Sequence, residues 1–245
     1  MPIPSYGVDP ILFTQHPGYR RGVLVVEGAA NGPSSAGLTA QLRQEEAALR
    51  TRLAGQTLTD RPEVAAWRAA FRAFGAKPAE HRSAVEALAR RVLRPDLLPS
   101  INALVDIGNL VSIRHLLPAG VHPRPLSGTQ VMLRPAREGD TFLPADGSAL
   151  EAPPCGEVVF CQGQDVLTRR WTWRQAAGTQ TLARTSAVYF NVDALAPISD
   201  AVLQAAMQDI EALVRHETGG RVVRHAVLDA AQPAFDAFAP APQTP

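Results

Sequence analysis

Apolar residues recur at every third or fourth position in several stretches of the chain, a spacing that predicts amphipathic helices. Five helices are expected, over residues 38–52, where good helix formers dominate, and over 60–75, 79–94, 101–117 and 199–220. Trp67 falls on the apolar face of the second helix and is predicted to lie in the core. Gly108 lowers the stability of the fourth helix, so its presence indicates that another backbone or a ligand approaches closely.

Strands are expected where β-branched and aromatic residues cluster between turn residues. They are residues 21–28, 156–175 with a turn at Gly163–Gln164, 185–195 and 221–230. Asp193 is the last charged residue of the 185–195 strand and is expected at its exit. The predicted secondary structure therefore changes from mainly helical to mainly β at about residue 121, before the last helix.

The segment RRWTWRQ (169–175) combines three arginines with two of the three tryptophans of the chain. If it is one continuous strand, Trp171 and Trp173 stand about 7 Å apart on one face. Arg170 and Arg174 then lie on the opposite face, where their guanidinium groups can hold a phosphodiester or a carboxylate. The alternative is an amphipathic strand with buried indoles and solvated arginines, which the periodicity alone favours.

Charge and hydropathy narrow the classes of partner. The net charge of +1 gives no overall attraction to nucleic acid, so any RNA contact is a local patch, and no DNA partner is expected. All basic residues except Lys77 are arginine, which suits planar contacts with phosphate, although genomic composition bias explains the same excess. No apolar run is long enough to span a membrane, and no signal peptide is apparent, so we expect a cytoplasmic protein.

Familiar catalytic motifs are absent from the chain. It has no nucleophile elbow, phosphate-binding loop, dinucleotide fingerprint or zinc-protease helix. Cys155 and Cys161 are expected to be reduced thiols, because two cysteines make neither a disulfide framework nor a zinc site. His115 and His122 are near neighbours, but no cysteine or carboxylate joins them at ligand spacing. We therefore expect no metal and no cofactor.

Three blocks of sequence carry a family resemblance. They are NALVDIGNLVSIRHLLPAG (102–120), GEVVFCQGQDVLTRRWTWRQ (156–175) followed by Gly178–Thr179, and TSAVYFNVDAL (185–195). Together, and in this order, they resemble the free-standing B3/B4-domain proteins, which are related to the editing domain of the phenylalanyl-tRNA synthetase beta chain. Asp106, Gly108, Asn109 and Pro118 stand where the synthetase has its D-x-T-N motif and the later proline. The resemblance covers roughly residues 70–230.

The resemblance implies a three-layer α+β fold with a central β-sandwich flanked by helices. It implies a B3/B4-like domain over 61–232, with an N-terminal extension (1–60) packed on that domain. Composition predicts a disordered tail (233–245). The implied activity is hydrolysis of the ester that joins a wrongly attached aromatic amino acid to the terminal ribose of tRNA. Water is the nucleophile in that reaction, so it needs no serine or cysteine motif.

The chain departs from the synthetase pattern at three places. Gly120 stands where the synthetase has a histidine, and Gln180 stands in place of a glutamate before the matching Thr185. Arg174–Gln175 replaces a pair of glycines. These changes remove candidates for general acid–base work and for binding a tyrosyl hydroxyl. The arginine-rich replacement instead indicates a more polar or anionic ligand than tyrosine.

Our leading hypothesis is a module that binds the acceptor end of tRNA and hydrolyses mischarged species in trans. The residues expected to act are Asn109 and Thr179 in catalysis, Gly108, Trp173, Arg174, Gln175 and Thr185 in substrate binding, and Arg134 and Arg170 at RNA phosphates. Two alternatives stay open, a small-molecule sensor or enzyme that keeps the fold without tRNA and a non-catalytic binding domain. The positions of Arg134, Arg170 and Arg174 distinguish these hypotheses, because their convergence beside a cleft with a basic rim would favour tRNA binding.

Overall fold

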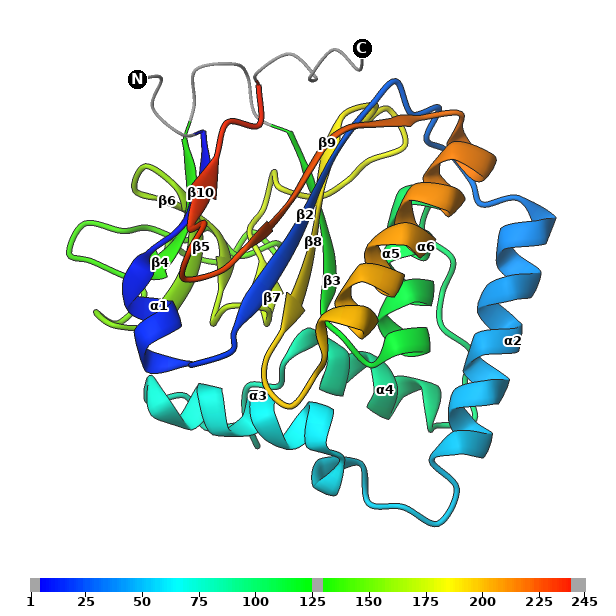
Figure 1. Ribbon diagram of the computed structural model, residues 1–245, viewed down its shortest axis with the longest axis horizontal. Helices are drawn as coiled ribbons and strands as arrows, with labels where there is room; N and C mark the ends of the chain where they lie inside the picture. The colour runs from blue at the N-terminus through cyan, green and yellow to red at the C-terminus, as the bar shows by residue number, and fades with distance from the viewer. Residues whose placement is uncertain (1–4, 125–129, 239–245) are drawn as a thin grey trace.

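The computed structural model describes residues 5–124 and 130–238, and two β-sheets that face each other form its centre (Figure 1). The larger sheet contains, in order, β10 (Ala234–Phe235), β1 (Tyr6–Val8), β4 (Val131–Pro135), β5 (Val158–Gln162), β6 (Asp165–Arg169) and β7 (Arg174–Gln175). The smaller sheet contains β3 (Ala119–Pro123), β8 (Val188–Ala194), β2 (Arg20–Glu27) and β9 (Arg221–Leu228). The rings of Tyr6 and Tyr189, one from each sheet, meet edge to face with centroids 5.2 Å apart, so the inner faces are in contact.

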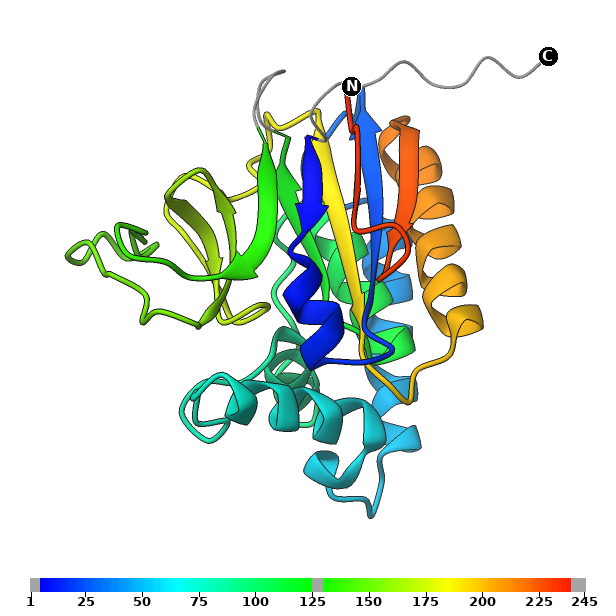
Figure 2. The same ribbon diagram turned by 60° about the vertical axis from the view of Figure 1, so that its left-hand side comes forward.

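Helices form a third layer on the outer face of the smaller sheet (Figure 2). The elements of this layer are α5 (Ala103–His115) and α6 (Asp200–Thr218), which pack on the sheet, and α2 (Ala36–Arg52), which packs against α5. The remaining helices are α3 (Pro62–Ala73) and α4 (Ala84–Val92) at one end of the sheets, the short α1 (Pro10–Gln15) and a 3₁₀ turn (Leu58–Asp60). The expected α+β fold, a β-sandwich flanked by helices, is confirmed.

Local sequence explains where α6 begins and ends and how closely α5 approaches β3. The hydroxyl of Ser199 caps α6 by accepting from the Val202 amide, and Gly219 ends this helix with a left-handed φ of 64°. A Cβ at Gly108 in α5 would lie 3.2 Å from the carbonyl oxygen of Ala119 in β3. The close backbone approach predicted for this glycine is therefore confirmed. The core position predicted for Trp67 is also confirmed, since its side chain is fully buried.

The chain ends contribute strands to both sheets. Within the expected N-terminal extension (1–60), β1 pairs with β4, and β2 lies between β8 and β9 at the centre of the smaller sheet. Within the expected tail, Ala234–Phe235 pairs with β1 as β10 and is a strand rather than a disordered segment. Residues 239–245 lie outside the described residues. Strands from near the two ends of the chain thus pair at one edge of the larger sheet.

The continuous strand predicted for residues 167–175 is wrong. β6 ends at Arg169, and Arg170 and Trp171 adopt left-handed φ angles of 46° and 64° in a turn that leads into β7. The Trp171 indole, 2% exposed, packs edge to face against Tyr19 at 4.8 Å and Trp67 at 5.2 Å between centroids. Burial of this ring in the core offsets the backbone strain of the turn, which alternation in the sequence does not reveal.

Candidate functional site

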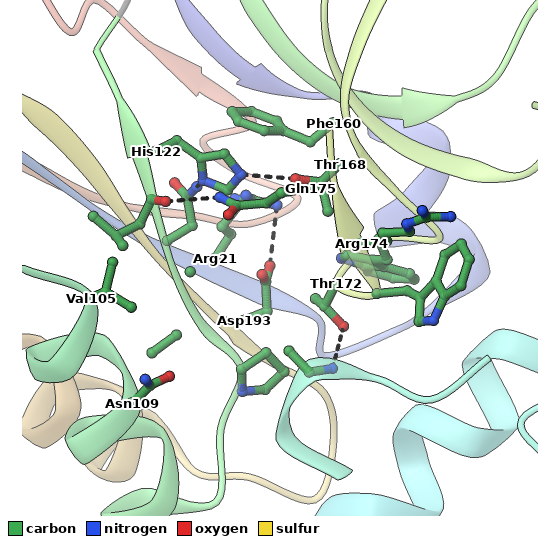
Figure 3. Close-up of a pocket in the computed structure, with 18 residues that line it drawn as sticks. Arg21, Val105, Asn109, His122, Phe160, Thr168, Thr172, Arg174, Gln175 and Asp193 are labelled. Atoms are coloured by element: carbon green, nitrogen blue, oxygen red, sulfur yellow. Dashed lines mark hydrogen bonds and ion pairs between the residues drawn. The ribbon is translucent and has the colours of Figure 1, made fainter. Parts of the chain in front are cut away.

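A cavity of about 260 Å³ lies between the two sheets and the helices α4 and α5 (Figure 3). Its walls are β3, β8, the turn after β6, the first residue of α4 and one face of α5. The volume lies just below the range of about 300–1,000 Å³ that is typical of drug-sized ligands. The cavity is therefore suited to a ligand of about the size of an amino acid.

Five buried polar side chains line the inner part of the cavity, and we call them the polar floor: Arg21, His122, Thr168, Asn191 and Asp193. The register of β2 and β8 places Arg21 directly opposite Asp193. Asn191 and Asp193 share one face of β8, because alternate side chains of a strand point the same way. This face turns toward the larger sheet, which contributes Thr168 from β6.

A directed chain of hydrogen bonds links most of the polar floor. Arg21 Nε donates to the Tyr6 hydroxyl at 2.9 Å, and that hydroxyl donates to Asn191 Oδ1 at 2.5 Å. Asn191 Nδ2 donates to His122 Nδ1 at 3.1 Å, and His122 Nε2 donates to Thr168 Oγ1 at 2.8 Å. The Asn191 amide sets these directions, because its oxygen only accepts, here from Tyr6, and its nitrogen only donates, here to His122 Nδ1.

The electrostatics of the floor keep His122 neutral. Burial, together with the nearby charge of Arg21, lowers the pKa of His122 to about 3. Burial also raises the pKa of Asp193, while Arg21 acts in the opposite sense on the same carboxyl. The Asp193 carboxylate lies 3.3 Å from Arg21 Nη1 and accepts from the Tyr19 hydroxyl at 2.5 Å. Tyr19 in turn accepts from the Trp171 indole N–H at 3.3 Å.

The structure brings together four of the residues predicted from the sequence. Asn109 on α5, Trp173 in the turn and Arg174–Gln175 on β7 all line this cavity. Gly108 precedes Asn109 and lets α5 approach β3, so it acts behind the wall. The Asn109 carboxamide makes no hydrogen bond within residues 5–124 and 130–238, so it is available to a ligand. Gln175 Nε2 instead donates to the Val121 carbonyl at 2.9 Å.

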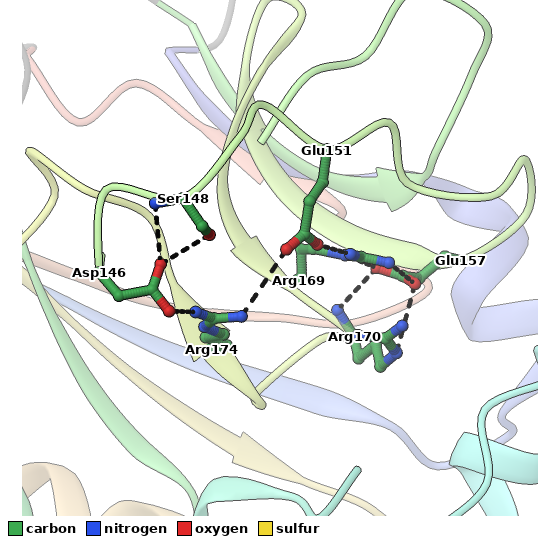
Figure 4. A network of polar contacts seen from close by, with 7 residues as sticks. All are labelled: Asp146, Ser148, Glu151, Glu157, Arg169, Arg170 and Arg174. Atoms are coloured by element: carbon green, nitrogen blue, oxygen red, sulfur yellow. Dashed lines mark hydrogen bonds and ion pairs between the residues drawn. The ribbon is translucent and has the colours of Figure 1, made fainter. Parts of the chain in front are cut away.

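Alternating charges surround the arginines of the turn between β6 and β7, and we call this set the charge ladder (Figure 4). In order, its members are Asp146, Arg174, Glu151, Arg169, Glu157 and Arg170. Arg174 Nη2 lies 2.9 Å from Asp146 Oδ2, and Arg170 Nε lies 3.4 Å from Glu157 Oε2. The guanidinium carbons of Arg170 and Arg174 lie 4.4 and 5.6 Å from the Trp173 ring centroid. Each arginine thus has a carboxylate partner near the cavity.

The other predicted site residues lie elsewhere. The Thr179 hydroxyl donates to the Ala176 carbonyl at 2.8 Å and lines a neighbouring cavity of about 190 Å³. Thr185 Oγ1 accepts from the Leu182 amide at 3.0 Å and does not line the cavity. Arg134 forms a bidentate pair with Asp140 at 2.6 and 2.8 Å beside a separate cavity. Arg170 faces another cavity, so the three arginines do not converge on one rim.

Sequence reasoning missed the polar floor, although one signal was present. In VYFNVDA (188–194) the polar residues Tyr189, Asn191 and Asp193 alternate with apolar ones on a strand that is buried throughout. A polar row on a buried strand indicates a hydrogen-bonded interior site. Arg21 carries a similar signal, since it directly precedes the apolar run of β2 and is 1% exposed. His122 gave no signal in the sequence, because its partners lie on other strands.

Among the described residues, no helix is both long enough and apolar enough to cross a bilayer. In the same two segments, no three His, Cys, Asp or Glu side chains gather within reach of a single metal ion. That no metal or cofactor is required stays a prediction.

Comparison with protein families identifies the fold. The model of the B3/4 domain matches residues 66–237, which is most of the chain. The chain belongs to the B3/4 domain family. The match includes β3 to β10 and α4 to α6, and the N-terminal strands β1 and β2 precede it. Arg21, Tyr19 and Tyr6 therefore reach the site of this B3/4 protein from outside the matched region.

One solved structure with partial similarity is a crystal structure of an N-terminal fragment of the phenylalanyl-tRNA synthetase beta-subunit from Pyrococcus horikoshii. It is 11% identical to this B3/4 protein, with a TM-score of 0.43. The comparison covers 89% of this chain and 49% of that fragment, so the chain spans about half the length of the synthetase fragment. No curated protein matches the chain.

Proposed function

We propose that this B3/4 protein accommodates the aminoacyl group of an aminoacyl-tRNA in the 260 Å³ cavity and hydrolyses its ester in trans. The observation that carries the proposal is that Asn109, Arg174 and Gln175, predicted from separate parts of the sequence, line one cavity of amino-acid size. Membership of the B3/4 domain family supports it.

The residues that line the cavity suggest how the ester would be bound and hydrolysed. The Asn109 carboxamide can orient the ester carbonyl or the attacking water. Arg174 can exchange its ion pair with Asp146, a mostly exposed carboxylate, for polar groups of the substrate. His122 is not a general base here, because its Nδ1 lone pair accepts from Asn191 and its pKa is about 3. Catalysis in this proposal therefore rests on positioning water against an already reactive ester.

RNA contact requires cations that are free to pair with phosphate. Arg134 and Arg170 are already paired with carboxylates, but a groove of about 490 Å³ runs along α4 and is lined by Arg82, Arg91 and Arg94. These three side chains are exposed and make no ion pair or hydrogen bond within the described part of the chain. We call them the α4 arginines and assign the phosphate contacts to them.

The position of α4 connects this groove to the cavity. Ala84, its first residue, lines the cavity mouth, and its backbone amide donates to Thr172 Oγ1 at 3.5 Å. The helix has 9 residues and is therefore about 14 Å long. Phosphates held by the α4 arginines would thus lie within a few nucleotides of an ester in the cavity.

A second candidate is a small-molecule-binding protein that keeps the fold without tRNA. The charge ladder favours it, because carboxylates neutralise Arg170 and Arg174 beside the cavity and leave no basic rim there. The polar floor and the size of the cavity suit either ligand. The two candidates differ in whether the α4 arginines contribute to binding.

A deacylation screen with a panel of mischarged tRNAs tests the proposal. We expect hydrolysis of at least one mischarged tRNA by the wild type and its loss in Asn109→Ala. Arg215→Ala is the matched control, because Arg215 is an exposed residue of α6 that does not line the cavity. Binding of free amino acids without hydrolysis of any mischarged tRNA would favour the second candidate.

A further inference from the structure

The polar floor determines which end group of a ligand can be buried in the cavity. Arg21, which only donates, starts the chain of hydrogen bonds that passes through Asn191 and reaches His122 Nδ1. A neutral imidazole that accepts at Nδ1 carries its proton on Nε2. Thr168 Oγ1 therefore accepts from His122, and its own hydroxyl hydrogen is left to donate.

Two donors of the floor have no acceptor in the described part of the chain. One is the Thr168 hydroxyl, whose oxygen makes only the bond to His122 among the side-chain contacts. The other is Arg21 Nη1, which is buried and has no hydrogen-bond partner, although Asp193 Oδ1 lies 3.3 Å away as its ion-pair partner. Thr168 lines the cavity, so its hydroxyl is placed beside a ligand, whereas Arg21 Nη1 is sealed from the cavity and acts there only through its charge.

The charge of the floor limits the complementary group. Asp193 neutralises Arg21 within the floor, and its own oxygen Oδ1 is occupied by the Tyr19 hydroxyl. An anionic end group would meet the Asp193 carboxylate in a buried site of low dielectric, where like charges repel strongly. An apolar end group would leave the Thr168 hydroxyl unsatisfied. An uncharged acceptor avoids both penalties.

We propose that the polar floor selects ligands whose buried end is an uncharged hydrogen-bond acceptor, such as a hydroxyl or carboxamide oxygen. The inference rests on the proposed function in that the ligand is an aminoacyl group, with its ester near Asn109 and its side chain toward Thr168. Figure 3 shows these two residues on opposite sides of the residues that line the cavity. Thr168 is then the specificity-determining residue of the site.

Small esters test this selection without tRNA. The probes are the methyl esters of threonine and valine, which differ by a hydroxyl against a methyl group, and those of asparagine, leucine and aspartate. Dissociation constants are measured by calorimetry at pH 7. We expect threonine and asparagine esters to bind at least about 100-fold more tightly than valine and leucine esters, since a site built around hydrogen bonds rejects analogues that lack them. The aspartate ester should bind more weakly than the asparagine ester.

Variants at Thr168 identify the group responsible. Thr168→Val removes the hydroxyl at nearly constant shape and should bring the threonine-to-valine ratio close to 1. Thr168→Ser is the matched control, which keeps the hydroxyl and should keep the ratio. Arg21 is left intact, because its removal would strand the buried Asp193 charge and unfold the protein. A melting curve of each variant at pH 7 confirms that it is folded.

Three results would overturn the inference: valine or leucine esters that bind as tightly as their polar partners, an unchanged ratio in Thr168→Val, or binding of none of the esters. The outcome is separable from that of the proposed function. Selective binding of polar esters without deacylation of any tRNA refutes the hydrolase and supports the floor. Deacylation of tRNAs that carry apolar amino acids alone supports the hydrolase and refutes the floor.

Discussion

Acidification from pH 7 to pH 5 is expected to destabilise the fold through His122. Its pKa in the folded protein is about 3, because burial and the charge of Arg21 disfavour the imidazolium form. In the unfolded chain a histidine titrates near 6.5. Between these values the unfolded chain binds a proton that the folded protein does not, so the free energy of unfolding falls as the pH is lowered.

The size of the effect follows from the two pKa values. The slope approaches about 1.4 kcal/mol per pH unit below pH 6.5, and integration from pH 7 to pH 5 gives about 2 kcal/mol. His122 is 6% exposed and both of its ring nitrogens have partners, so little solvent relieves the cost of charging it. Asp193 has a raised pKa and acts with the opposite sign, since its contribution is lost as the pH rises through that pKa.

Urea denaturation of wild type, His122→Gln and His122→Asn at pH 7, 6 and 5 measures the effect. Glutamine keeps an amide that can donate to Thr168, and asparagine keeps an oxygen that can accept from Asn191. Both variants should be less stable at pH 7 but should lack the further loss of about 2 kcal/mol on acidification. His16 and His81, whose pKa values burial also lowers, remain in every protein and cancel in the comparison. Equal pH dependence in all three proteins would refute the reasoning.

Three further predictions concern the core, the cavity and the RNA surface. Trp171→Ala should lower the free energy of unfolding by about 3–5 kcal/mol, because the indole is fully buried, and an unchanged melting temperature would contradict this. Arg174→Ala should abolish ester binding or hydrolysis with little change in melting temperature, since its ion pair with a mostly exposed carboxylate stabilises weakly. Replacing Arg82, Arg91 and Arg94 by glutamine should reduce the slope of log affinity for tRNA against log salt by about 2, whereas R184Q/R215Q/R221Q, with the same charge change, should not.

The sequence predicted the five longer helices, α2 to α6, from apolar stripes or from runs of good helix formers, but it missed the short α1. α6 shows this most clearly, since Ser199 and Gly219 mark its ends and its buried residues repeat with helical spacing. The strands β2, β8 and β9 were also predicted, because β-branched residues cluster in them. These patterns depend on residues that are close in sequence, so they predict helices and strands without knowledge of the tertiary contacts.

The segment after Thr168 could not be predicted in this way. RRWTWRQ alternates like a strand, yet a turn at Arg170 and Trp171 redirects the chain so that the indole enters the core. The reason lies in residues distant in sequence, since Trp171 packs on Tyr19 and Trp67. Tertiary packing here overrides a local pattern, and the same turn places Trp173 and Arg174 at the cavity.

The candidate site was predicted in part for a related reason. Asn109 and Arg174 came from the family resemblance and do share a cavity, but no pattern in the sequence links Arg21 to Asp193 across two strands. The roles given to Arg134 and Arg170 did not take into account the acidic residues that pair with them. Pairing between distant charges is a tertiary property, and it determines whether an arginine is free to bind a ligand.

The origin of Arg21 bears on how a shared fold acquires its own ligand. Most of the cavity wall comes from the region that matches the B3/4 family, whereas Arg21 and Tyr6 come from strands that precede it. β2 lies between β8 and β9, and the register places its Arg21 directly opposite Asp193 on β8. The guanidinium charge therefore reaches the inner face of the smaller sheet. A buried carboxylate without its partner is costly, so the site requires β2, the N-terminal strand that carries Arg21. The residues before the matched region are therefore part of the site, and a fragment that begins after them would lose both the central strand and the donor that starts the hydrogen-bond chain.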